Sequence, residues 1–193
     1  ERWLAPPASG PGLRALELGA GTGAGSLALA ALGFSVVATD EDEESLGLLR
    51  LSAAASGLGG RVETAPLRWG AESRLLGGAY DAVVAADVAY YEDSFIPLVR
   101  TLVLLAHDGT AVLLAHRPRG DGEQQVHFFH LLEAEFDLEP IHYDVGLGVT
   151  IYRLYRSEDK KSREAVAASS CDYCCFLQRQ HAELNEWPYV GVV

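Results

Sequence analysis

The stretch LELGAGTGAGSLALAALGFSVVATD, residues 16–40, decides the fold. It places three glycines at alternate positions, Gly19, Gly21 and Gly23, after one apolar segment and ends a second apolar segment on Asp40. Glycines between a strand and a helix permit a tight turn and let a ligand approach the backbone closely. An acid at the end of the next strand suits the hydroxyls of a ribose. Taken alone, the pattern leaves two cofactors open, a nicotinamide dinucleotide and S-adenosylmethionine.

Around this stretch, short apolar runs alternate with helix-like segments, which is the pattern of a parallel sheet with crossover helices. The expected strands cover residues 13–18, 34–40, 61–67, 80–87, 109–117, 137–145 and 149–156. The last two are joined only by a short GLG link, so they must pair antiparallel, because a parallel return needs a crossover of a dozen or more residues. We therefore expect an α/β fold, a doubly wound seven-strand Rossmann-like sheet that is mostly parallel and ends in an antiparallel hairpin.

Four helices are expected between these strands, beginning near Gly23 and covering residues 41–58, 94–106 and 126–136. Pro97 is placed in the first turn of the third helix, where its missing N–H costs little. The first helix is expected to turn four apolar side chains towards the sheet: Leu27, Leu29, Ala30 and Ala31.

Composition changes near Ser157, where the polar stretch SEDKKSREAVAASS begins. We expect one domain over residues 1–156, followed by a polar linker and C-terminal tail, residues 157–193, whose role is unknown. The chain contains no methionine, even at position 1, so we expect the native N-terminus to be missing.

The charge and the cysteines bound the partners and the compartment. A formal net charge of −12 disfavours attraction to a phosphate backbone, and no run approaches the roughly 20 apolar residues that span a bilayer. All three cysteines lie within residues 171–175, so no disulfide framework crosses the domain. We expect a soluble, cytoplasmic monomer that binds neither nucleic acid nor membrane.

The sequence CDYCC, residues 171–175, offers two thiols at C-x-x-C spacing. A structural zinc site takes four ligands, and the nearest further candidate is His181. We therefore expect ordinary tail cysteines and no metal.

Two acids near the glycines are candidate cofactor ligands. Asp40 is placed to accept hydrogen bonds from ribose hydroxyls, although an Asp there can instead cap the helix that follows. Glu17 lies near the end of a strand that is expected to be buried, and a buried carboxylate needs a partner. The amino group of the methionine portion of S-adenosylmethionine would be one.

Two further motifs follow the third and fourth strands, PLRWG at residues 66–70 and AADVAYY at residues 85–91. Both leave the carboxyl edge of the sheet, which is the edge where open α/β sheets bind ligands. Trp69 suits either stacking on an adenine ring or core packing. Asp87 and Tyr90 suit either a ligand site or a turn cap with local packing.

In this order and at these separations, ALELGAGTG, ATD, LRWG and YDAVVAADVAYYEDSF resemble the seven-strand protein-lysine methyltransferases outside the SET class. That group includes the enzymes that modify valosin-containing protein and heat-shock chaperones. The resemblance covers roughly residues 13–156, and its most specific elements are RWG and the D-x-x-Y motif at residues 87–90. It implies a methyltransferase that uses S-adenosylmethionine and acts on a lysine of a protein substrate.

The resemblance also implies roles for individual residues. Asp40 would hold the ribose, whereas Asp87 and Tyr90 would shape the acceptor side near the transferred methyl group. Gly19, Ala20 and Gly21 would line the methionine end of the cofactor, and Trp69 and Ala86 would border its adenine or central portion. Glu17 and Gly23, which the residues themselves suggest, complete the expected cofactor-binding set. Family members usually carry an upstream tryptophan segment that closes over the cofactor, and Trp3 lies too close to the glycine turn to be that residue.

Three other interpretations stay open from the residues alone. A small-molecule methyltransferase would have the same cofactor site, and a non-catalytic cofactor-binding or interaction module would retain the fold without the reaction. A nicotinamide oxidoreductase is supported only by the glycine turn and Asp40.

Overall fold

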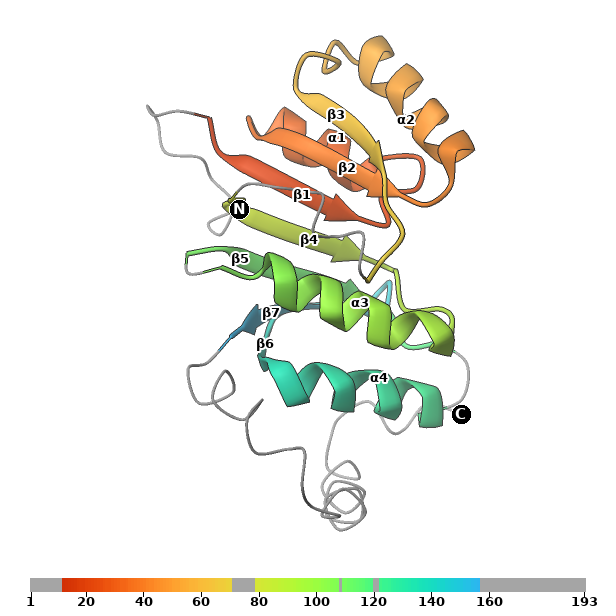
Figure 1. Ribbon diagram of the computed structural model, residues 1–193, viewed down its shortest axis with the longest axis vertical. Coiled ribbons are helices and arrows are strands. Elements are labelled where there is room, and N and C mark those ends of the chain that lie inside the picture. Colours follow the sequence, from red (N-terminus) through yellow and green to blue (C-terminus); the bar gives the residue numbers. More distant parts are fainter. Residues whose placement is uncertain (1–11, 71–78, 108, 120–121, 157–193) are drawn as a thin grey trace. The chain divides into compact units, whose positions relative to one another are not determined.

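The computed structural model describes residues 12–70, 79–107, 109–119 and 122–156, and within them seven strands form one mixed sheet (Figure 1). The strands are β1 (Arg14–Leu18), β2 (Ser35–Asp40), β3 (Val62–Pro66), β4 (Ala82–Ala86), β5 (Ala111–His116), β6 (Asp137–Asp144) and β7 (Val149–Tyr155). Their order across the sheet is β3-β2-β1-β4-β5-β7-β6, which confirms the expected doubly wound α/β fold.

The strand order opens a crevice at the centre of the sheet. From β1 the chain first builds β2 and β3 on one side and then crosses to β4 and β5 on the other, all in parallel. The connections that follow β1 and β4 therefore leave in opposite directions. Ligands of open α/β sheets bind at this position, outside the carboxyl ends of the strands.

The far edge of the sheet carries the expected hairpin. Strand β7 runs antiparallel between β5 and β6, and His116 at the end of β5 pairs with Thr150 near the start of β7. The turn between β6 and β7 consequently lies at the same edge of the sheet as the carboxyl end of β5.

Four helices in the described residues cover the two faces of the sheet: α1 (Ala24–Ala31), α2 (Glu43–Ala55), α3 (Glu92–Leu105) and α4 (Gly122–Glu135). Neighbouring residues of a strand point to opposite faces, so β1 contributes to two cores. Ala15 packs with Leu29 of α1, whereas Leu16 belongs to the larger cluster that holds Phe95 of α3 and Phe128 of α4. Figure 1 shows α3 and α4 together on one side of the sheet.

Two details of the expected helices are wrong. Ala31 is exposed in the last turn of α1, and only Leu29 and Ala30 of the four expected side chains are fully buried. Helix α3 begins at Glu92, so Pro97 falls in its second turn and leaves the carbonyl of Asp93 without a helical donor. Asp93 is exposed, where water can take the place of that donor.

The sequence predicts no segment that spans a membrane. Among the described residues, no helix is both long enough and apolar enough to cross a bilayer. The boundary near residue 157 and the cysteine-containing tail lie outside the described residues, so the linker and tail stay a prediction.

Gly23 is the residue of the turn on which the packing of α2 depends. Its φ is +95°, and a Cβ at this position would come within 2.9 Å of Leu49 Cδ1, a fully buried atom of α2. Only glycine satisfies both the backbone conformation and the space. Gly57 also has a positive φ, +70°, but a Cβ there would meet nothing within 4 Å.

We expect Gly23→Ala to lower the free energy of unfolding by more than Gly57→Ala, as measured by urea denaturation. Gly57→Ala imposes only the left-handed backbone cost of roughly 1–2 kcal/mol. Gly23→Ala adds overpacking against Leu49, which costs about 1–3 kcal/mol more. Equal losses in the two variants would show that α2 moves away without cost.

Candidate functional site

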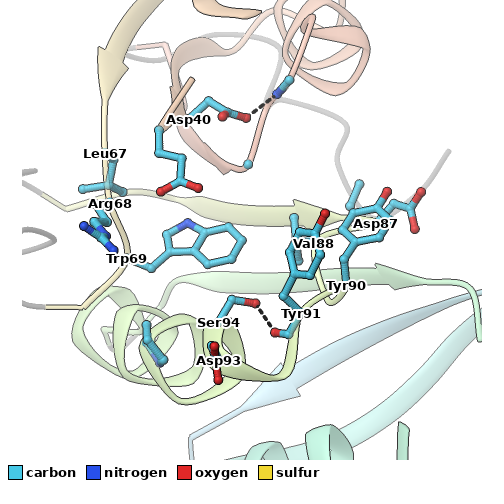
Figure 2. Close-up of a pocket in the computed structure, with 15 residues that line it drawn as sticks. Asp40, Leu67, Arg68, Trp69, Asp87, Val88, Tyr90, Tyr91, Asp93 and Ser94 are labelled. Carbon is cyan, nitrogen blue, oxygen red and sulfur yellow. Dashed lines mark hydrogen bonds between the residues drawn. The ribbon is translucent and has the colours of Figure 1, made fainter. Parts of the chain in front are cut away.

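A cavity of about 530 Å³ opens at the carboxyl ends of β1 to β4 (Figure 2). Its walls include most of the predicted site residues, namely Gly19, Gly21, Asp40, Trp69, Ala86, Asp87 and Tyr90. Glu17, Ala20 and Gly23 are not part of its lining. Sequence reasoning missed the remaining lining residues, which are Glu41, Leu67, Arg68, Val88, Tyr91, Asp93, Ser94 and Pro97.

Gly19 brings three connections together. Its φ is +65°, and a Cβ would lie 2.8 Å from Val88 Cγ1 and 3.2 Å from Trp69 Cζ2. Any larger residue would therefore push apart the segments that follow β1, β3 and β4. At Gly21 a Cβ would meet nothing within 4 Å, so this part of the turn borders open space in the cavity.

Ala20 has a structural role between these two glycines. Its side chain is buried beside Ala38 and Leu49, and its N–H donates to the carbonyl of Thr39 over 2.9 Å. Its own carbonyl accepts from the N–H of Gly23 over 2.9 Å. Ala20 therefore fixes the turn against β2 and supports the cavity without lining it.

Asp40 closes the wall at the end of β2. Its Oδ2 accepts from the N–H of Gly21 over 2.8 Å, and its Oδ1 accepts from the N–H of Asp42 over 3.0 Å. These bonds orient the carboxylate, and each oxygen keeps a further lone pair for a ligand.

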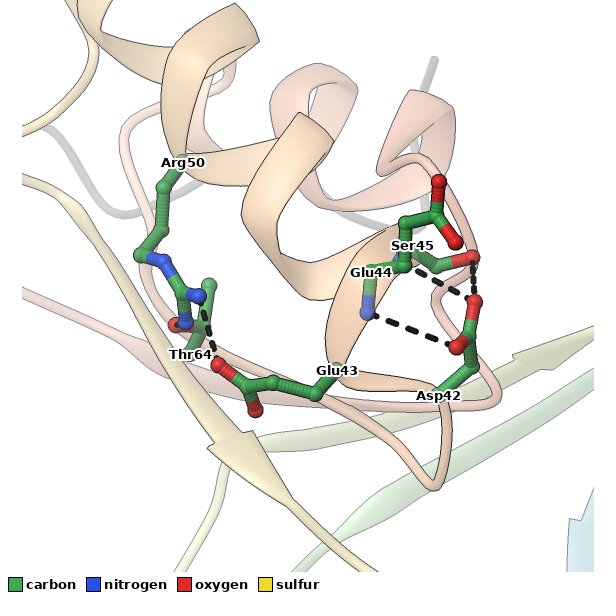
Figure 3. A network of polar contacts seen from close by, with 6 residues as sticks. All are labelled: Asp42, Glu43, Glu44, Ser45, Arg50 and Thr64. Atoms are coloured by element: carbon green, nitrogen blue, oxygen red, sulfur yellow. Dashed lines mark hydrogen bonds and ion pairs between the residues drawn. The ribbon is translucent and has the colours of Figure 1, made fainter.

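The helix cap that the sequence left open for Asp40 belongs to Asp42. Its carboxylate accepts from the backbone N–H groups of Glu44 and Ser45, and from the Ser45 hydroxyl (Figure 3). The bonds from Ser45 lower the pKa of Asp42 below its ordinary value. Asp40 is therefore left for the cavity, and its alternative as the N-cap of α2 is wrong.

The first turn of α2 is also tied to β3. Arg50 Nη2 lies 2.6 Å from Glu43 Oε1, and Arg50 Nη1 donates to Thr64 Oγ1 over 2.9 Å (Figure 3). These contacts hold α2, and with it the Asp42 cap, beside the strand that leads to Trp69.

Trp69 both packs in the core and lines the cavity. Its partly buried indole contacts the large apolar cluster, and Figure 2 shows it lying between Asp40 and the segment that carries Asp87 and Tyr90. The two interpretations of this residue are therefore compatible, because the ring both contacts the apolar cluster and borders the cavity.

A buried threonine, Thr101, holds the RWG segment. No motif in the sequence indicated this contact. The N–H of Gly70 donates to Thr101 Oγ1 over 2.9 Å, and the Thr101 hydroxyl donates to the carbonyl of Pro97 over 2.9 Å. Leu67, immediately before the segment, donates its N–H to the carbonyl of Asp40 over 2.9 Å. Trp69 is thus fixed between β2 and α3.

Asp87 has an unusual backbone. It is the non-glycine residue with a positive φ among the described residues, at 56°, a conformation that Asp tolerates better than most side chains. Its N–H donates to the carbonyl of Ala115 over 2.9 Å, which anchors the turn to β5. The strained turn directs the Asp87 side chain to the cavity wall rather than into the core.

The D-x-x-Y motif brings Asp87 and Tyr90 together at the cavity. Burial, a hydrogen bond to Asp87 and the charge of that carboxylate all raise the pKa of the Tyr90 hydroxyl above its ordinary value of 10.0. Tyr90 is therefore neutral at physiological pH. A phenol that donates to Asp87 keeps oxygen lone pairs that can accept from another donor.

Glu17 is fully buried, as expected, and has a partner within the chain. The hydroxyl and the backbone N–H of Ser26, in the first turn of α1, both donate to its carboxylate. Burial is the main cause that raises its pKa above the ordinary value of 4.5. The positive end of the α1 dipole also faces this carboxylate. Its predicted contact with a ligand amino group stays a prediction.

No group of three or more His, Cys, Asp or Glu side chains in the described part of the chain has an arrangement that could hold a metal. The predicted tail cysteines lie outside that part.

Comparison with known proteins identifies the family. A family model described as lysine methyltransferase matches residues 5–135. Protein N-lysine methyltransferase METTL21A of Danio rerio is 34% identical over 151 residues, which cover 76% of this chain and 68% of that protein. EEF1A lysine methyltransferase 3 of Mus musculus is 31% identical over 163 residues, covering 84% of this chain and 68% of that protein.

Solved structures agree in fold. Magnesium protoporphyrin IX methyltransferase from Synechocystis PCC 6803 with bound SAM aligns with a TM-score of 0.58 at 21% identity, covering 76% of this chain and 71% of that chain. A protein from Clostridium thermocellum, described as an rRNA-methylase, aligns with a TM-score of 0.61 at 13% identity, covering 74% of this chain and 86% of that chain. These structures share the fold alone, whereas the family model and the sequence matches show that the chain belongs to the lysine methyltransferase family.

Proposed function

We propose that this chain transfers a methyl group from S-adenosylmethionine to a lysine side chain of a protein substrate. Membership of the family makes it a methyltransferase with S-adenosylmethionine as its cofactor. The observation that carries the proposal is that one cavity joins Asp40 and Trp69 to the Asp87–Tyr90 pair. Predicted cofactor residues and predicted acceptor residues thus share a single space.

The cavity fits the cofactor in size and in chemistry. Its volume of about 530 Å³ lies within the range of small-molecule sites, roughly 300–1,000 Å³. The open side of Gly21 leaves room beside the backbone, and the oriented Asp40 carboxylate has lone pairs for ribose hydroxyls. The Trp69 indole supplies an apolar wall beside Asp40 for the adenine.

The bound cofactor supplies an electrophilic methyl group on a positively charged sulfur. The protein contributes by positioning the acceptor amine in line with that methyl group and by excluding water. We assign this positioning to Asp87 and Tyr90, because the Asp87 carboxylate and the Tyr90 hydroxyl oxygen can both accept hydrogen bonds from an amine. Neither residue is required to act as a general base.

The acceptor amine must be neutral to attack. A lysine has an unperturbed pKa of about 10.4, and removal from water beside a positive charge favours its neutral form. Tyr90 keeps its own proton at physiological pH, as its raised pKa indicates. Tyr90 is therefore not available as a base, and in the proposed reaction the amine releases its proton to solvent before the methyl group is transferred.

The protein substrate is supported by the relatives, which are named as protein-lysine methyltransferases. The net charge of −12 favours a basic segment of a partner over nucleic acid. We further propose that the protein is a cytoplasmic monomer that does not bind membranes.

The proposal is tested by incubating the protein with tritiated S-adenosylmethionine and a proteome extract and resolving labelled proteins by mass. We expect a labelled protein band with the wild type. Asp40→Ala should weaken cofactor binding, measured by calorimetry, on the order of tenfold or more, because charge-assisted hydrogen bonds are lost.

The matched control is Asp42→Ala. It removes the cap of α2, and so lowers stability, but Asp42 does not line the cavity, so cofactor affinity should hold. A label found only in small metabolites would indicate a small-molecule methyltransferase. Absence of cofactor binding by the wild type would indicate a non-catalytic module.

Substitution of Asp87 separates positioning of the acceptor from binding of the cofactor. We expect Asp87→Ala, and also Asp87→Asn, which tolerates the left-handed backbone, to lower the labelling rate on the order of 10²-fold or more. Calorimetry should give a cofactor affinity close to the wild-type value. Joint loss of transfer and binding would instead make Asp87 a cofactor ligand.

We expect Glu17 to lower the stability of the fold at neutral pH and to contribute to cofactor binding. Because burial raises its pKa, its ionised form destabilises the fold at neutral pH, and this cost fades as the pH falls through the raised pKa. Glu17→Gln should therefore raise the urea midpoint at pH 7.5, with a smaller gain near pH 5. If Glu17 faces the cofactor's amino group, the same variant binds S-adenosylmethionine more weakly. Unchanged affinity would contradict that contact.

A further inference from the structure

Arg119, in the segment that follows β5, contacts both residues of the D-x-x-Y motif. Its Nη2 lies 2.5 Å from Asp87 Oδ2, and its guanidinium carbon lies 4.8 Å from the centroid of the Tyr90 ring. A planar guanidinium can bond a carboxylate and stack on an aromatic ring at the same time. One side chain therefore holds the relative positions of Asp87 and Tyr90.

The backbone of Arg119 is itself held by the neighbouring elements. Gln125, in the first part of α4, donates from Nε2 to the carbonyl of Arg119 over 2.9 Å. The Oε1 atom of Gln125 contacts Nε2 of His116, which is buried at the end of β5. Phe129 packs against the His116 ring edge to face.

These contacts determine which atom carries each proton. Since Gln125 donates from its amide nitrogen to Arg119, its amide oxygen faces His116 and can only accept. Burial lowers the pKa of His116, so the ring is neutral and carries its proton on Nε2. The ring, the amide and the Arg119 carbonyl thus form a chain with each donor matched to an acceptor.

We propose that Arg119 is a positioning residue for methyl transfer, which orients Asp87 and Tyr90 and offsets the negative charge of Asp87 beside the acceptor amine. This inference rests on the proposed function, because it concerns the same acceptor side. Arg119 is not itself a lining residue of the cavity, and it acts through Asp87 and Tyr90, which are.

The charge of Arg119 matters because the acceptor amine must be neutral to attack the methyl group. A carboxylate close to a lysine stabilises its ammonium form and raises its pKa, which opposes attack on the methyl group. The Arg119 guanidinium bonded to Asp87 opposes this effect. Asp87 can then orient the amine without holding its proton.

The other charges around this position do not provide the same compensation. His116 interacts with Asp87 but is neutral. Besides Asp87, the charged side chains that line the cavity are three acids, Asp40, Glu41 and Asp93, and one cation among the described residues, Arg68. Arg119 is thus the cation bonded to Asp87 itself.

The first test measures, as a function of pH, the initial rate of tritium transfer into the substrate protein that the wild-type enzyme labels. Arg119→Ala should shift the acidic limb of the profile by about one pH unit to higher pH, and so reduce the rate below that limb roughly tenfold. Arg119→Lys keeps the charge but not the planar contact. It should retain the wild-type limb with a lower plateau.

Arg117→Ala is the matched control, since Arg117 is exposed in the same segment two residues earlier. It should leave the rate and the pH profile unchanged. The pair of Arg119 and Asp87 is about half exposed, with side-chain exposures of 47% and 45%. We therefore expect the thermal midpoint of Arg119→Ala to stay close to the wild type.

The second test does not depend on turnover. The chain has eight tyrosines, so ring-¹³C-tyrosine NMR resolves few signals, and Tyr90→Phe identifies the Tyr90 resonance by its absence. At pH 7, Arg119→Ala should shift that resonance, whereas Arg117→Ala should not.

Two results would overturn the inference. One is a Tyr90 resonance that does not move in Arg119→Ala, which would show that the contact is absent in solution. The other is a rate and pH profile for Arg119→Ala that match those of Arg117→Ala. If the wild type labels no protein, the proposed function fails, and the Tyr90 resonance still decides whether Arg119 holds the motif.

Discussion

The approach of Trp69 and Val88 to Gly19 is the contact on which the site depends. At this point the segments after β1, β3 and β4 converge, and a Cβ on Gly19 would lie 2.8 Å from Val88 and 3.2 Å from Trp69. A residue with a side chain there would separate the three segments. The missing Cβ therefore sets the distance between the side of the cavity that holds Asp40 and the side that holds Asp87.

The three acidic residues predicted for the site are each stabilised by different contacts. Asp40 is oriented by two backbone N–H groups, and Asp87 is paired with Arg119. Glu17 is buried and receives two hydrogen bonds from Ser26, yet burial still raises its pKa. Each carboxylate is thus held by different contacts, Asp40 and Asp87 at the cavity wall and Glu17 outside its lining.

Much of this arrangement was predictable because it depends on local pattern. Apolar runs separated by helical spacing indicate the strands and helices, and the short link before residue 149 requires an antiparallel hairpin. The position of Pro97 was not predictable, because helix boundaries depend on which residues the tertiary structure adds to the first turn. The cap of α2 at Asp42 instead of Asp40 was left open for the same reason.

The sequence by itself determined the element order, the edge of the sheet that carries the site, and the types of side chain delivered there. These follow from periodicity and from the chain direction of parallel strands. Only the tertiary structure decided that Thr101 holds the RWG segment, that Ser26 partners Glu17, and that Arg119 joins Asp87 to Tyr90. Such contacts join residues from separate elements, and no local pattern encodes which distant side chains meet once the sheet has assembled.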